Sequence, residues 1–121
     1  MDINLKRVGR ALIVALEGEL DLATAPRVKD TVDQVLARDA KLHHLVWDLA
    51  KVEFIDSSGL GMLLGRYNKI SARAGSVVLM RPAVLVRRML VMAGMGRIMQ
   101  FVDSEEQALA KIGGDTDGQL H

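Results

Sequence analysis

The pattern of apolar and polar positions divides the chain into short strand-like runs and longer helical stretches. Runs rich in Val, Ile and Leu alternate with segments in which apolar residues recur every three or four positions. The runs predict β-strands at 3–7, 11–17, 44–49, 76–80 and 99–102. The periodic segments predict helices at about 26–38, 58–72, 83–92 and 103–112. Strands that alternate with helices after an initial hairpin are typical of an α/β domain, here with a mixed sheet of roughly four to five strands and about four helices.

The segment between the third strand and the second helix has the most unusual composition in the chain. It reads Glu53-Phe-Ile-Asp-Ser-Ser-Gly-Leu-Gly61. Asp56, Ser57 and Ser58 are all suited to cap a helix, because a short side-chain oxygen accepts from the free N–H groups of the first turn. Each of the two glycines costs roughly 1 kcal/mol relative to alanine inside a helix. Their presence is understandable if something must approach the backbone closely.

The topology places this segment where α/β sheets usually meet their ligands. Right-handed crossovers bring the ends of the middle strands beside the helix N-termini, and binding loops gather at that edge. Asp21, in the sequence Gly18-Glu-Leu-Asp21, leaves the second strand and could lie beside the 53–61 segment.

Charged residues are expected mainly on solvated faces of the helices. In the first helix Val28 and Val32 face inward, whereas Lys29, Asp30 and Asp33 face outward. Arg66, Arg87 and Arg88 are also predicted to be solvated. For Arg66, contact with an acidic partner is the alternative.

Composition narrows the classes of function. Sixteen basic and fifteen acidic residues leave a formal charge of +1, so there is no electrostatic footprint for nucleic acid or for an anionic membrane. The four aromatic residues provide no platform for stacking bases. The absence of cysteine excludes disulfides and thiolate chemistry. No apolar run approaches the ~20 residues of a membrane span, and we expect a cytoplasmic protein that needs no metal or other cofactor.

The length suits one compact domain with a single core. We expect this domain to occupy residues 1–112. The remaining residues, 113–121, are rich in glycine and polar residues and are predicted to form a flexible tail.

Several motifs resemble those of STAS domains, and in particular of the anti-sigma-factor antagonists of the sporulation sigma-F system. The likeness runs in register over roughly residues 3 to 112. It rests on Gly18-Glu-Leu-Asp21, Phe54-Ile-Asp-Ser-Ser-Gly-Leu-Gly61, Leu64-Gly-Arg-Tyr67, Pro82-Ala-Val, Val86-Arg-Arg and Ser104-Glu-Glu-Gln-Ala-Leu109. One departure is Ala93, where relatives often carry Ser or Thr before a glycine.

The resemblance implies a phosphorylation switch. The serine directly after the aspartate, here Ser57, would be phosphorylated by an anti-sigma factor that is itself a serine kinase. The unphosphorylated protein would bind that anti-sigma factor and free the sigma factor, and a PP2C-type serine phosphatase would reverse the modification. The resemblance also implies that Asp21 lies close to Ser57.

We assign roles within this segment as a hypothesis. Ser57 is the phosphoacceptor, Asp56 positions its hydroxyl, and Ser58 caps the second helix. Asp21 supports phosphorylation or partner contact, with an ordinary turn residue as the alternative. Met62 is expected to be an exposed contact. The remaining candidates for partner binding follow Ser58 directly in the chain: Gly59, Leu60 and Gly61.

Two other classes of function compete with this one. An enzyme with Ser57 as nucleophile would need a base within hydrogen-bond reach, and no histidine is obviously placed to serve. Gly-x-Ser-x-Gly is also absent, so we expect a protein without catalysis of its own. The other alternative is a STAS accessory subunit of a membrane transport or lipid-transport complex.

Overall fold

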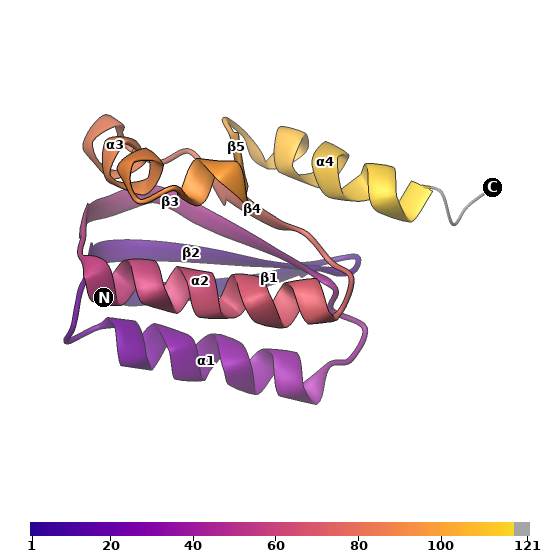
Figure 1. Cartoon of the computed structure of the whole chain (residues 1–121). Coiled ribbons are helices and arrows are strands. Elements are labelled where there is room, and N and C mark those ends of the chain that lie inside the picture. Colours follow the sequence, from indigo (N-terminus) through magenta and orange to yellow (C-terminus); the bar gives the residue numbers. More distant parts are fainter. Residues whose placement is uncertain (118–121) are drawn as a thin grey trace.

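A five-stranded sheet runs through the molecule in the order β1-β2-β3-β4-β5 (Figure 1). The computed structural model describes residues 1–117, and of residues 113–117 only the backbone. Strand β1 pairs antiparallel with β2, and the other neighbouring strands are parallel. The elements are β1 Asp2–Val8, β2 Ala11–Leu20, α1 Ala25–Arg38, β3 His44–Ile55, α2 Ser57–Ala72, β4 Val77–Met80, α3 Val84–Met92, a 3₁₀ turn Met95–Arg97, β5 Gln100–Val102 and α4 Glu105–Asp117. The expected α/β domain with an initial hairpin and a mixed sheet is confirmed.

Helices cover both faces of the sheet, as the alternation along β2 requires. Leu12 and Val14 point into a core shared with α1, α2 and α3, whereas Ile13 lies in a second core beneath α4. Successive residues of a strand face opposite sides, so one strand can supply both cores. No helix among the described residues has the length and apolar character needed to cross a lipid bilayer.

Strand β3 continues to Ile55, six residues beyond its predicted end at residue 49. Its register with β2 slips twice, so that β3 carries extra residues opposite β2. These bulges replace the two-residue alternation with burial at every third position, at Leu49, Val52 and Ile55. A search of the sequence for the two-residue period of a strand therefore places the end of β3 too early. The extension matters because it carries the chain directly to Asp56 and Ser57.

Differences at the other elements are small, except at the C-terminus. Helix α3 ends at Met92, and Gly94 takes the left-handed conformation expected of it, with φ of 82°. Helix α4 runs to Asp117 instead of ending near Ile112, so the first part of the expected tail is helical. The rest of that tail, 118–121, lies outside the described residues.

Candidate functional site

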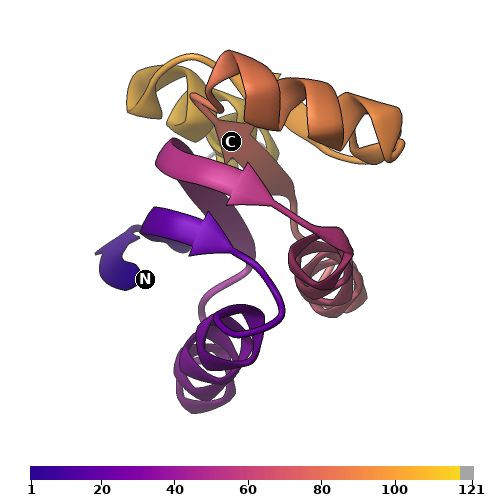
Figure 2. The ribbon, with the colours of Figure 1, turned by 90° about the vertical axis from the view of Figure 1, so that its left-hand side faces the viewer.

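The loops that follow β2 and β3 meet at one edge of the sheet. Figure 2 faces this edge, with β2 leading into α1 and β3 leading into α2. Leu20 and Ile55 are paired at the ends of the two strands, and the backbone N–H of Asp56 donates to the carbonyl of Leu20 at 3.2 Å. The edge therefore brings together the two segments that the sequence marked as candidates.

Asp56 holds this edge together. Its Oδ1 accepts from the backbone N–H groups of Ser58 at 2.8 Å and Gly59 at 3.1 Å, which makes Asp56 the N-cap of α2. Its Oδ2 accepts from the backbone N–H of Leu22 at 3.2 Å, in the neighbouring loop. The prediction that Ser58 caps the helix is wrong, because a carboxylate can bond the first turn with one oxygen and the next loop with the other. The prediction that Asp56 positions the Ser57 hydroxyl is not supported, since both carboxylate oxygens bond to backbone N–H groups.

Ser57 is the first residue of α2 and is exposed. Within the described part of the chain, its hydroxyl makes no hydrogen bond that would hold it in place. Ser57 thus lies at the N-terminal end of a helix, on the surface of the molecule. His43 and His44 lie at the other end of β3, where they contact Arg10 and Ser76 respectively. Neither is placed to act as a base for Ser57.

Asp21 organises its own loop. Its Oδ1 accepts from the backbone N–H groups of Ala23 at 3.0 Å and Thr24 at 3.1 Å. The Thr24 hydroxyl donates to the carbonyl of Glu19 at 2.8 Å, which braces the same loop. These contacts fit the alternative of a turn residue. The loop nevertheless lies beside Ser57, because Leu22 bonds to Asp56.

The two glycines of α2 differ in their surroundings. A Cβ at Gly59 would lie 2.6 Å from the carbonyl oxygen of Leu20, so the close approach is made by this protein's own β2. A Cβ at Gly61 would meet nothing within 4 Å. Leu60 is half-buried against the core. Met62 is only 5% exposed, so the prediction of an exposed contact is wrong.

The prediction that Arg66 is solvated is wrong. Arg66 is 4% exposed, and its Nε lies 3.0 Å from Oδ1 of Asp33 on α1. Lys69 also pairs with Asp33, at 3.2 Å. Neither Arg66 nor Asp33 is therefore the freely solvated residue that was expected. A signal was present in the sequence, since residue 66 falls on the same helical stripe as the buried Leu63 and Ile70.

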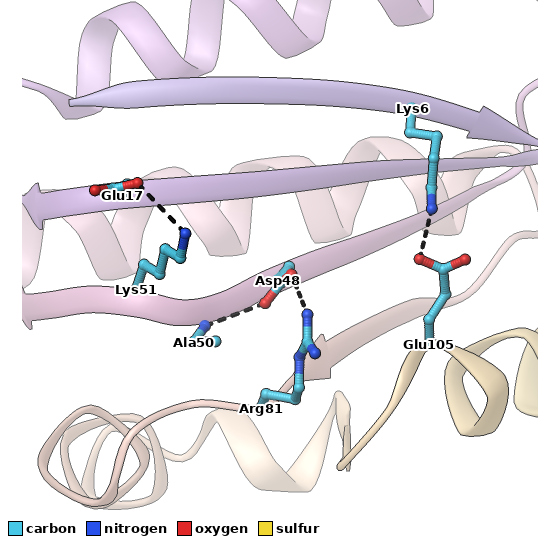
Figure 3. Close-up of polar contacts among 7 residues, drawn as sticks. All are labelled: Lys6, Glu17, Asp48, Ala50, Lys51, Arg81 and Glu105. Carbon is cyan, nitrogen blue, oxygen red and sulfur yellow. Dashed lines mark hydrogen bonds and ion pairs between the residues drawn. The ribbon is translucent and has the colours of Figure 1, made fainter.

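A second set of charges lies on the sheet face beside α4 (Figure 3). Arg81 donates to Asp48 at 2.6 Å, and Lys51 lies 3.9 Å from Glu17. These four residues line a hollow of about 500 Å³. Lys6 lies nearby and pairs with Glu105 at the start of α4, at 2.7 Å. Apart from Asp2, which also lines the hollow, the charged residues of its lining are paired with one another.

Comparisons with known proteins agree with the fold described above. Residues 2–108 match the STAS domain. The chain is 36% identical over 112 residues to an anti-sigma F factor antagonist of Paenibacillus polymyxa, a match that covers 93% of this chain and 95% of that protein. The structure is similar to the anti-sigma factor antagonist SpoIIAA in its unphosphorylated form, with a TM-score of 0.81, 29% identity and coverage of 93% and 97% of the two chains. It is also similar to the phosphorylated form of Bacillus SpoIIAA, with a TM-score of 0.72, 25% identity and coverage of 92% and 99%.

Proposed function

The chain belongs to the STAS domain family, and we propose that it is an anti-sigma factor antagonist controlled by phosphorylation of Ser57. In its unphosphorylated form it binds an anti-sigma factor that is also a serine kinase, and so releases a sigma factor. The kinase transfers phosphate to Ser57 and the complex dissociates. A PP2C-type phosphatase restores the binding form. The protein acts in the cytoplasm, in control of sporulation, and has no catalytic activity of its own.

The observation that carries this proposal is the position of Ser57. It is exposed at the start of α2, directly after the Asp56 cap, and its hydroxyl is unbonded within the described residues. A kinase can reach such a hydroxyl without unfolding the helix. Further support comes from SpoIIAA, a relative whose solved structures include a phosphorylated form.

Charge explains how the switch would act. A phosphate adds about −1.5 to −2 charges, and a helix N-terminus tolerates an anion, with a gain of typically about 0.3–1 kcal/mol. The fold should therefore survive modification. An interface that closed over the dianion would bury an unpaired charge, at a cost of several kcal/mol. Phosphorylation therefore weakens binding while the fold stays nearly unchanged.

A release assay tests the proposal. The unphosphorylated protein is added to a preformed complex of the sigma factor and the anti-sigma kinase from the same organism. We expect it to displace the sigma factor, as measured by size-exclusion chromatography, and expect the kinase-treated protein to fail. Failure of the unphosphorylated protein to bind the anti-sigma factor would contradict the proposed function.

A further inference from the structure

A groove between α1 and α2 lies beside the Ser57 edge. Its volume is about 290 Å³. Apolar side chains make up much of its lining, contributed by the loop after β2, the start of α1 and the first turns of α2: Leu22, Ala25, Pro26 and Met62. Leu22 is 73% exposed and leaves an apolar rim facing solvent.

The charged residues that line this groove are both basic. Lys29 lies on the exposed side of α1, and Arg66 lies on α2. The Nε of Arg66 forms an ion pair with Asp33 at 3.0 Å, so its charge is already partly balanced, but its Nη1 is buried and has no hydrogen-bond partner among the described residues. A buried guanidinium nitrogen without a partner is unfavourable, so a ligand that supplied an acceptor would gain from this site.

The neighbouring helix end adds to the positive character of the groove. Ser58, in the first turn of α2, also lines it. The N–H groups of Ser58 and Gly59 already bond to Asp56, so the helix end adds only its dipole to the groove. Lys29, which is unpaired within the described part of the chain, the open Nη1 of Arg66 and the apolar lining together suit a carboxylate carried next to an apolar side chain, because guanidinium and carboxylate pair in a fork geometry.

We propose that the α1–α2 groove receives an acidic side chain and an adjacent apolar side chain of the anti-sigma factor, with the carboxylate paired to Arg66 and Lys29. This inference rests on the proposed function and identifies the chemistry of the partner's contact. It also gives phosphorylation a second effect. A phosphate on Ser57, next to Ser58 in the groove wall, competes with the partner's carboxylate for the same positive charges.

Filling the groove tests its apolar part. Gly61 lines the groove and a Cβ there meets nothing within 4 Å, so Gly61→Leu should fill the space without disturbing the fold. Gly65→Leu is the matched control, because Gly65 lies on the same helix, is equally open and does not line the groove. By calorimetric titration with the anti-sigma factor, we expect Gly61→Leu to weaken binding about tenfold or more and Gly65→Leu to change it less than about twofold.

Reversing a charge tests the carboxylate. Lys29→Glu should weaken binding about tenfold or more, whereas Lys41→Glu, the same change in the turn between α1 and β3, should change it less than about twofold. Each Asp and Glu on the partner's binding surface is then changed to Asn or Gln in the presence of Lys29 or Lys29→Gln. One partner acid should show a non-additive effect with Lys29→Gln.

The outcomes separate this inference from the proposed function. If the wild-type protein does not bind the anti-sigma factor, both fail. If it binds and the groove variants behave like their controls, only the groove inference fails. Loss of affinity in Gly61→Leu with no effect of Lys29→Glu and no coupled acid would also overturn it, because the groove would then be an apolar contact without a carboxylate.

Discussion

Two hollows on this molecule differ in how their charges are used. The larger one, on the sheet face beside α4, is lined by Asp2 and by two ion pairs, Asp48 with Arg81 and Glu17 with Lys51. The smaller one, between α1 and α2, is lined by basic residues whose positive charge is only partly neutralised. The volume of a hollow is therefore a poor guide to an interaction site in this protein. Groups left without a partner are the better guide, because a ligand can still satisfy them.

The same contrast applies to single residues at the sheet edge. Asp21 and Asp56 are engaged by backbone N–H groups and shape the edge. Ser57 lies beside them with its hydroxyl unengaged. The edge is therefore held by hydrogen bonds to backbone N–H groups and presents one exposed hydroxyl, whereas most charges on the sheet face beside α4 are paired with one another. Four predictions test this comparison.

The largest effect is expected from a permanent charge at residue 57. Ser57→Asp should weaken binding to the anti-sigma factor by about 4 kcal/mol, roughly a thousandfold. Its free energy of unfolding should change by less than about 1 kcal/mol, because the helix N-terminus tolerates an anion. Ser104→Asp is the control, since Ser104 accepts from Gln107 N–H at the start of α4 and the change adds the same charge at another helix end. Unfolding of Ser57→Asp, or unchanged affinity, would contradict the account.

A substitution at Gly59 tests how closely α2 packs against β2. Gly59→Ala places a Cβ against the backbone of Leu20 and should lower the free energy of unfolding by about 1–3 kcal/mol, as overpacking usually does. Gly61→Ala has open space and should raise that free energy by up to about 1 kcal/mol, because alanine favours the helix. Urea denaturation of both variants measures the difference. Equal behaviour of the two would mean that β2 and α2 are not in close contact.

The cap of α2 should matter less than this close contact. Asp56→Ala removes bonds to two helix N–H groups and one loop N–H group, and should destabilise the protein by about 0.5–2 kcal/mol. Ser58→Ala should change the free energy of unfolding by less than about 0.5 kcal/mol, since its side chain is not the cap. Thermal and urea unfolding would reveal the reverse order if Ser58 were the true cap.

The smallest effects are expected on the sheet face beside α4. Asp48→Asn keeps an acceptor for the N–H of Ala50 but loses the charge that pairs with the half-exposed Arg81. The loss of stability should be at most about 1 kcal/mol. Affinity for the anti-sigma factor should change less than about twofold by calorimetry. A large loss of affinity would mean that this face, and not the groove, contacts the partner.

Much of this architecture could be predicted from local patterns, and the errors share a cause. The order of strands and helices follows from periodicity, and the position of Ser57 at a helix start follows from the serine and aspartate before an apolar helix. The end of β3 was missed because bulges erase its period. The ion pair of Arg66 with Asp33 and the hydrogen bond of Asp56 with Leu22 join distant parts of the chain. Local patterns carry no information about such partners.

The most direct test of the central claim is to locate the phosphate. The purified protein is incubated with the anti-sigma kinase and ATP, and its intact mass is measured beside Ser57→Ala and Ser58→Ala. We predict the gain of a single phosphate by the wild-type protein and by Ser58→Ala, and no gain by Ser57→Ala. Phosphate on Ser58 instead, or no phosphate on the wild-type protein from a kinase shown to be active, would contradict the account.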